Sequence, residues 1–348
     1  MPRDVAALTA DFLLSISDDE PERVFSEEAD VAKKEMRKLA FAWHPDRNAD
    51  SRAGAVFHKV QVLYARAEQK RAAGTWEVPG QLTIKAANGR VFTLSYARRH
   101  AVDIGSLYVG RSVFAFEVGS ANLDLVDEGL AQQGMLTYAD SAMEAEFSKY
   151  FPQLARKVET HTGAVLVYQK NQGQLLLKDV LEHFNGKMPP RHVAWLISRL
   201  LNIACYLERQ AKLSHNGIGV DTVFISPELH SVALTGWWFA AGQGEPLKAL
   251  SRNAAMYAPP DVLTAKQGNS RTDIELIKAL GRQLLGDASG ARLRGDASIP
   301  AAMVDWLELS TAQDAVSAFK EWQNRVLLDA FGQRRFEELA LTFIDIYS

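Results

Sequence analysis

The chain has 348 residues and is too long for one ordinary compact core, so two domains are expected. Hydrophobic residues make up 47% of the sequence and charged residues 23%, which is close to the globular average and excludes a mainly disordered chain. The formal net charge of −3 excludes an overall attraction to nucleic acid, and the single cysteine, Cys205, excludes an internal disulfide framework.

The first apolar stretch, Val5–Ile16, is interrupted by Asp11 and is too short to cross a membrane. It also lacks the basic start and the small-residue cleavage site of a secretory signal. We therefore expect a cytoplasmic protein with neither a membrane nor a nucleic acid as its partner.

A basic helix is predicted over Ser26–Ala42, with Ser26 as its N-cap and acidic residues in its first turn. Its buried face is predicted from helical spacing at Ala32, Met36 and Leu39. Residues four apart lie on one side of a helix, so four cations form a compact positive surface: Lys33, Lys34, Arg37 and Lys38. The ordinary explanation of such a surface is a solvated charged face.

A second amphipathic helix is predicted over Arg52–Ala73, and the two helices are expected to form an antiparallel hairpin. Its inward residues are expected to be Phe57, Val60, Tyr64 and Ala67. Pro45 keeps His44 out of the helical region and ends the first helix, while Asp46 bonds to the local backbone of the tip. An exposed, rigid His-Asp pair beside cations indicates recognition, because no nucleophile or metal-ligand cluster lies near it in the sequence.

Residues Lys33–Asp46 resemble the second helix and the loop of a J domain nearly position by position. Phe57–Tyr64 resembles the start of the third helix of that domain, and Gln69–Ala73 is similar to a basic pentapeptide of bacterial DnaJ proteins. The first helix is poorly marked, and either Glu22–Phe25 or Val5–Ile16 takes its place.

This resemblance implies a co-chaperone that docks on a DnaK-type chaperone and stimulates its ATP hydrolysis. It carries over the tripeptide His44, Pro45 and Asp46 directly. It also carries over an electrostatic footprint, which consists of Lys33, Lys34, Arg37, Lys38 and Arg47. The J domain is assigned to residues 1–74.

Residues 75–90 are predicted as a linker and the start of a leading hairpin. The strand-like segments Gln81–Lys85 and Val91–Tyr96 flank its Asn-Gly turn. Further strands are predicted over Ser106–Val109 and Val113–Val118. From about Ala121 the pattern is mainly helical, with helices over Asn122–Gly134, Arg191–Gln210 and Trp306–Tyr347. Strands followed by helices indicate an α+β unit.

That order resembles the protein-kinase fold between roughly Val91 and Leu328. His215-Asn216-Gly217 follows the long helix, where a kinase has its catalytic loop, and two short strands come next at Val223–Ile225 and Val232–Leu234. Tyr257–Asp261 is similar to the Ala-Pro-Glu segment, and Asp273–Leu276 to the kinase helix that carries a buried Asp. The resemblance implies a two-lobed α+β protein-kinase-like domain over residues 91–348.

The groups needed for phosphoryl transfer are missing from the matching positions. Gly217 stands at the position of the catalytic Asp, Thr222 at that of the metal-binding Asn, and Gly236-Trp237-Trp238 at Asp-Phe-Gly. Glu117 or Phe116 replaces the phosphate-binding Lys. The two tryptophans are expected to point in different directions and fill the core, and Glu128, at the regulatory-helix Glu position, lacks its usual Lys partner. We expect a pseudokinase with no catalytic residue, cofactor or metal.

Three functions follow from these patterns. The first is a co-chaperone whose kinase-like domain binds a client or partner protein. The second is an atypical kinase or nucleotide-binding enzyme that uses displaced carboxylates, namely Glu117, Asp221 or Asp273, although Asp273 is better explained as a structural group that binds backbone. The third is a decoy that inhibits the host chaperone system.

Overall fold

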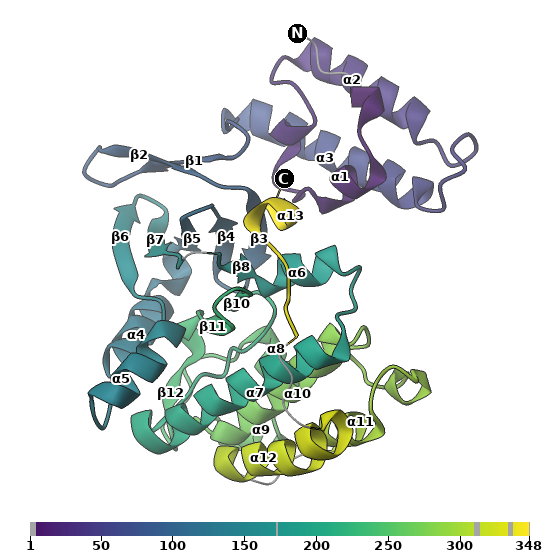
Figure 1. Ribbon diagram of the computed structural model, residues 1–348. Coiled ribbons are helices and arrows are strands. Elements are labelled where there is room, and N and C mark those ends of the chain that lie inside the picture. The colour runs from purple at the N-terminus through teal and green to yellow at the C-terminus, as the bar shows by residue number, and fades with distance from the viewer. Residues whose placement is uncertain (1–4, 172, 310–313, 333–336, 348) are drawn as a thin grey trace. The chain divides into compact units, whose positions relative to one another are not determined.

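The computed structural model describes residues 5–171, 173–309, 314–332 and 337–347, and the chain divides into two compact units (Figure 1). The first unit comprises Met1–Ala101 and Ser106–Gly110, and the second comprises Val102–Gly105 and Arg111–Ser348. An α-helical N-terminal region is followed by a mixed α+β region with antiparallel sheets, as the sequence predicts at this level. The first unit extends beyond residues 1–74 and includes the hairpin that follows the helices.

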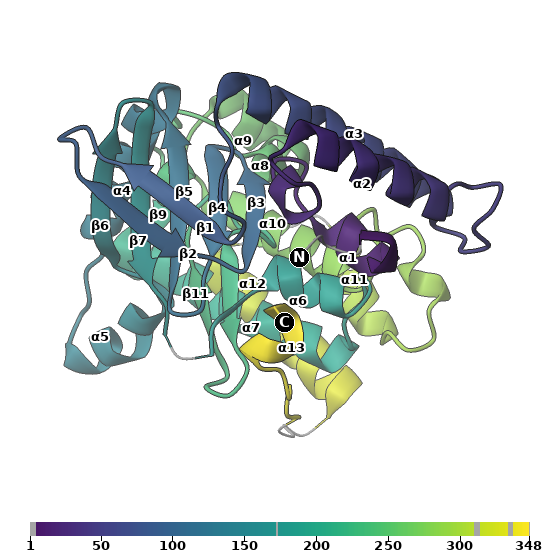
Figure 2. The same cartoon turned by 90° about the horizontal axis from the view of Figure 1, so that it is seen from above.

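Three helices form the N-terminal region: α1 (Ala10–Ser15), α2 (Ala29–Ala42) and α3 (Ala53–Ala73). Helices α2 and α3 lie side by side and antiparallel, as predicted (Figure 2). Of the two candidates for a first helix, the stretch Val5–Ile16 contains α1, which packs on α3. The other candidate contains only a 3₁₀ turn, Pro21–Arg23.

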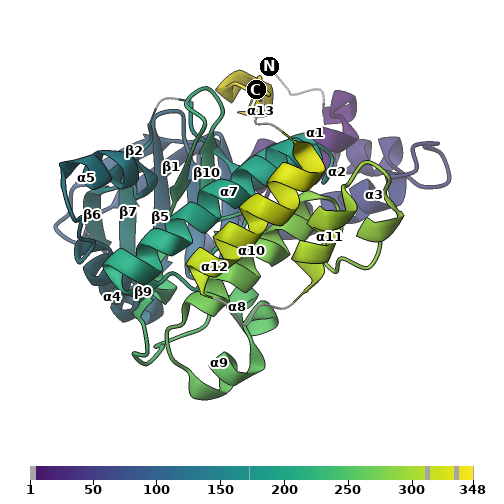
Figure 3. The same ribbon diagram turned by 60° about the horizontal axis from the view of Figure 1, so that its bottom comes forward.

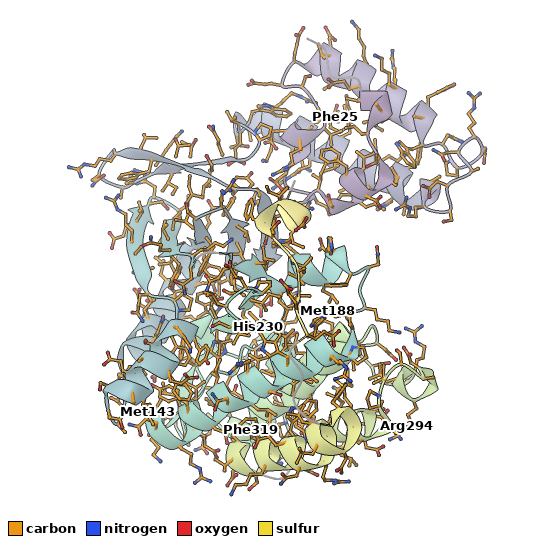
Figure 4. All side chains as sticks on the ribbon, in the orientation of Figure 1. Phe25, Met143, Met188, His230, Arg294 and Phe319 are labelled. Carbon is orange, nitrogen blue, oxygen red and sulfur yellow. The ribbon has the colours of Figure 1, made fainter. Side chains whose placement is uncertain are left out.

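The core of the first unit is a continuous apolar cluster between these helices. Phe25 is buried within it and meets the Tyr64 ring edge-on, with 5.4 Å between the centroids (Figure 4). The predicted inward residues that are buried are Ala32, Leu39, Val60 and Ala67, whereas Met36, Phe57 and Tyr64 are half-buried. The buried stripe of α3 is centred on Val56, Val60, Leu63 and Ala67, so the aromatic rings lie at its edges.

The predicted N-cap at Ser26 is wrong. Helix α2 begins at Ala29, and Glu28 at the cap makes no side-chain bond. Ser26 donates instead from its N–H and from its hydroxyl to the Glu35 carboxylate, each at 2.8 Å. Because Glu35 is buried, its carboxylate needs such donors, and this requirement places Ser26 outside the helix.

A buried ion pair ties the end of α3 to the 3₁₀ turn. The Lys70 ammonium lies 2.6 Å from the Glu22 carboxylate, and both side chains are buried, while Glu77 adds a second contact at 3.1 Å. The neighbouring Arg71 donates to the Ser26 carbonyl at 3.3 Å. Both cations of the pentapeptide Gln69–Ala73 therefore have partners inside the first unit.

The predicted hairpin is confirmed. Strands β1 (Gln81–Lys85) and β2 (Val91–Ser95) are antiparallel, with Gln81 opposite Ser95 and Lys85 opposite Val91. Gly89 in the turn has a φ of +81°, which glycine adopts without strain. Strand β4 (Gly105–Val109) is also where the sequence predicts it, whereas β3 (Arg98–Val102) was not predicted.

Strands β5 (Val113–Gly119), β6 (Leu154–Thr160) and β7 (Gly163–Gln169) form antiparallel pairs in the second unit, with β7 between the other two. Strands β6 and β7 contradict the expectation of a mainly helical chain after Ala121. The run of β7 is almost wholly apolar, and periodicity alone does not separate such a run from a buried helix. Helices α4 (Leu123–Gly134) and α5 (Ser141–Phe147) precede these strands.

The rest of the second unit is largely helical, and α7, α10 and α12 lie side by side (Figure 3). Its helices are α6 (Leu177–His183), α7 (Pro190–Tyr206), α8 (Arg252–Tyr257), α9 (Pro260–Ala265), α10 (Ser270–Leu284), α11 (Ala301–Glu308), α12 (Ala315–Glu321) and α13 (Phe343–Tyr347). Two π-helical segments, Leu207–Ala211 and Trp322–Phe331, continue α7 and α12.

Two small antiparallel sheets accompany these helices. In one, β10 (Val223–Ser226) lies between β8 (Leu175–Leu176) and β11 (Ser231–Leu234). In the other, β9 (Leu213–Ser214) pairs with β12 (Ala241–Gly242).

The predicted long helix is confirmed by α7, whose buried residues include Val193, Leu196 and Leu200. The prediction of one helical segment over Trp306–Tyr347 is only partly correct, because residues 337–342 have no helix and α13 follows them. Trp322, at the start of the π-helical segment after α12, is fully buried, and its indole donates to the Ser198 hydroxyl of α7 at 2.9 Å.

Replacing Lys70 with Met is expected to cost about 3 kcal/mol, because it leaves the Glu22 carboxylate buried without its main partner. Hydrogen exchange of the α3 amides in the full chain measures this loss as faster exchange. Lys34→Met, at an exposed position of α2, is the matched control and should stay within about 0.5 kcal/mol of the wild type. The double variant Glu22→Leu with Lys70→Met should recover most of the loss, and a single variant as stable as the control would contradict this role.

Candidate functional site

The loop between α2 and α3 is held in one conformation by its own hydrogen bonds. The His44 carbonyl accepts from the backbone N–H groups of Arg47 and Asn48, both at 2.9 Å. The Asn48 amide donates to the Ala42 carbonyl at 2.9 Å and so satisfies the end of α2. We call residues His44–Arg47 the tip turn.

The His44 ring is oriented from two sides. Its Nδ1 accepts from the Asp46 backbone N–H at 3.2 Å. The His44 and Phe57 rings are in a T-shaped contact, with 5.5 Å between their centroids. With Nδ1 as an acceptor, the neutral ring carries its proton on Nε2. The His44 side chain remains 45% exposed, and Pro45 and Asp46 are also exposed. The tripeptide therefore presents fixed polar groups at the surface.

The predicted cations lie on the same structural element. Lys33, Lys34, Arg37 and Lys38 are all exposed on α2, within about 17 Å of the tip turn along the helix axis at 1.5 Å per residue. Arg47 is exposed and its guanidinium lies 4.4 Å over the Phe41 ring. Phe41 is itself 66% exposed, which is unusual for a large aromatic residue.

The structure thus brings the tripeptide and Arg47 together and spaces the other four cations along α2. Sequence reasoning did not single out Phe41, Asn48 or Phe57 for this surface. Phe41 and Phe57 fall inside the stretches that carry the resemblance, so the sequence contained that signal. The role of Asn48 depends on its hydrogen bond to the Ala42 carbonyl across the turn, which residue spacing does not predict.

The second unit has a buried polar centre at His215-Asn216-Gly217. The Asp273 carboxylate of α10 accepts from the backbone N–H groups of His215 and Asn216, each at 2.8 Å. Asp273, His215 and Asn216 are all buried. The expectation that Asp273 is a structural, backbone-binding carboxylate is confirmed.

Burial decides the protonation behaviour of this centre. It raises the pKa of Asp273 to about 7, against the lowering effect of its two backbone bonds. It also lowers the pKa of His215 to about 3, so this imidazole is neutral at physiological pH. Neither group is exposed to a substrate.

A cavity of about 100 Å³ lies beside this centre, bordered by Phe116, Gly217, Asp221, Thr222 and Trp238 among others. Ligand sites usually enclose about 300 Å³ or more. The rings of Phe116 and Trp238 meet edge-on at 4.6 Å, whereas Trp237 packs on His215 at 5.2 Å. The two tryptophans point in different directions and are both buried, as predicted.

Thr222, which borders this cavity, is bonded to neighbouring backbone groups. The Thr222 hydroxyl donates to the Gly217 carbonyl at 2.8 Å and accepts from the Gly219 N–H at 2.9 Å. Burial raises the pKa of Asp221. Glu117 follows Phe116 on β5 and so lies on the opposite face of that strand. The three displaced carboxylates of the enzyme hypothesis, Glu117, Asp221 and Asp273, do not form one site.

Glu128 has a partner that the sequence did not reveal. Lys248 donates to its carboxylate at 2.9 Å, and this bond lowers the pKa of Glu128. Helix α4, which carries Glu128, packs closely on the turn Trp237–Phe239. A Cβ added at Gly129 would lie 2.6 Å from the backbone of Trp237, so only glycine fits there.

In the part of the chain that the structure describes, no group of three or more His, Cys, Asp or Glu side chains is placed to hold a metal ion. Within the same residues, no helix is long and apolar enough to cross a membrane. The chain matches no model of a known protein family, and a search of curated proteins finds no relative. The functional assignment therefore depends on the residues and their geometry.

Asp273→Asn is expected to cost about 2 kcal/mol, because an amide oxygen replaces only one of two carboxylate acceptors and leaves a buried N–H unpaired. The raised pKa makes this cost depend on pH. The protonated carboxyl favours the folded state, so its contribution is fully present below about pH 4 and is lost as the pH rises through about 7. Urea unfolding at pH 5 and pH 8 should show the larger difference between the two proteins at pH 5. An equal difference at both values would contradict this titration.

Proposed function

We propose that the protein is a J-domain co-chaperone and that its first unit stimulates the ATPase of a DnaK-type chaperone. The observation that carries the proposal is the exposed tripeptide His44-Pro45-Asp46 at the tip of an antiparallel hairpin. Its resemblance to the J-domain loop continues upstream along α2 as far as Lys33.

The physical properties of the tip turn support this role. A turn that is already fixed by hydrogen bonds loses little conformational entropy when it docks. The exposed cations of α2 add long-range attraction for an acidic partner surface and increase the rate of encounter. The chain's net charge of −3 makes this positive surface a local feature.

For the second unit we propose a kinase-like scaffold that binds a protein partner and does not transfer phosphate. Support for the kinase-like assignment comes from Asp273 of α10, which fixes the turn after α7 in the order that the resemblance implies. Support for the loss of catalysis comes from the small size of the cavity bordered by Phe116 and Trp238. In this proposal the protein uses ATP only through the chaperone's active site.

His44→Gln is expected to return the chaperone's ATPase rate to that of the chaperone alone, because glutamine does not reproduce a ring held against Phe57. Single-turnover ATP hydrolysis with a cognate DnaK-type chaperone measures the effect. The matched control is His58→Gln, since His58 is exposed on α3 near the same end of the hairpin, and it should keep full stimulation.

Absence of stimulation by the wild type with any cognate chaperone would refute the J-domain proposal. Stimulation or binding accompanied by inhibited client refolding would instead identify a decoy. Refolding of a denatured reporter enzyme in the same mixture separates these outcomes.

Magnesium ATP is expected to leave the melting temperature of the full chain unchanged. A ligand that binds only the folded state raises that temperature, and the cavity beside Phe116 is too small for a nucleotide. Differential scanning fluorimetry with ATP, with and without magnesium, makes the measurement. A magnesium-dependent rise of several degrees would favour the atypical kinase.

A further inference from the structure

Helix α13 is seated in the second unit by a buried polar anchor. The Tyr347 hydroxyl donates to the Asp179 carboxylate of α6 at 2.8 Å and accepts from the Leu176 backbone N–H at 3.1 Å. Asp179 is 3% exposed, so this anchor lies out of water. Figures 1 and 2 show α13 beside α6.

A buried cation completes the seat. The Lys170 ammonium lies 5.2 Å from the centre of the Phe343 ring and 5.7 Å from that of Tyr347. The Arg111 guanidinium also lies over the Phe343 ring, 5.8 Å from its centroid. Burial lowers the pKa of Lys170 to about 8. Attraction between a cation and an aromatic face is strongest when the cation is desolvated.

The residues of α13 divide into an inner and an outer set. Phe343 and Tyr347, four residues apart, lie on one side with their rings tilted by 39° and 4.5 Å between the centroids, and Ile346 is 7% exposed. Ile344 is 60% exposed. This is the pattern of a short peptide bound through an aromatic pair and one aliphatic residue.

Helix α13 owes its conformation to this seat. Five residues are too few for a helix that is stable in water, and residues 337–342 before it have no regular secondary structure. The seat belongs to β8, α6 and the end of β7, which lie within the main body of the second unit.

We propose that this seat, formed by Lys170, Leu176 and Asp179, is a peptide-binding site for Phe-x-x-x-Tyr segments, and that α13 occupies it as a tethered ligand. A partner protein that presents a Phe and a Tyr four residues apart on a short helix competes with α13 for the site. The tether holds α13 at an effective concentration of about 1 mM, so a partner segment must bind more tightly or be locally concentrated. This inference does not depend on chaperone binding by the first unit.

The test uses a fluorescein-labelled peptide of residues 338–348 and a chain that ends at Leu341, which lacks α13. The peptide should bind this shortened chain at least tenfold more tightly than the full chain, in which α13 competes. Tyr347→Phe in the peptide should weaken binding about tenfold, since it removes the bond to a buried carboxylate. Ile344→Ala is the matched control and should bind like the original peptide. Asp179→Asn in the shortened chain should weaken binding of the original peptide.

No binding to a shortened chain that retains its circular dichroism and cooperative melting would overturn the proposal. If the shortened chain does not fold, the full chain with Cys205→Ser and a fluorophore at Ile344→Cys replaces it. Excess unlabelled peptide should then increase the rotational mobility of the fluorophore, and unchanged mobility would overturn the proposal. A full chain that dimerises while the shortened chain stays monomeric would place α13 in a second copy and overturn the tethered arrangement.

Discussion

The second unit depends on one buried carboxylate, that of Asp273, whose oxygens both accept hydrogen bonds from backbone N–H groups. Asp273 receives the N–H groups of His215 and Asn216, so the turn after α7 has one conformation. Asn216 adopts a φ of +58° there and its side chain donates to the Phe239 carbonyl, while Ser251 donates to the Asn216 carbonyl. The turn at residues 215–216 is thus joined to three distant positions, namely Phe239, Ser251 and Asp273. These hydrogen bonds hold the fold together, and the Asp273 carboxylate is buried and not exposed to a substrate.

In the first unit, hydrogen bonds also fix a turn, but this turn is at the surface. It is the tip turn, and the groups that its bonds position are exposed. Buried anchors, such as the pair of Glu22 and Lys70, lie at the opposite end of α3 from the tip turn. In the proposed function, this combination of buried anchors and exposed, fixed polar groups suits recognition of a partner.

The sequence revealed features whose causes are local. Helical spacing located α2, α3 and α7, and an Asn-Gly pair located the β1–β2 hairpin. The adjacency of Trp237 and Trp238 indicated that they pack in different directions. Features that depend on distant partners were missed. Lys248 lies 120 residues from Glu128, and the demand of the buried Glu35 for donors moved the start of α2. Strand β7 was missed because its apolar run has no period that separates a strand from a helix.

The contact between Phe116 and Trp238, which leaves only a small cavity beside it, bears on the stability of the folded protein. A protein whose folded form binds a nucleotide gains stability with the nucleotide concentration, by mass action. Here the rings of Phe116 and Trp238 pack edge-on at 4.6 Å and both are buried. If no nucleotide binds, as we propose, the population of folded chains does not change when the cellular nucleotide concentration rises or falls.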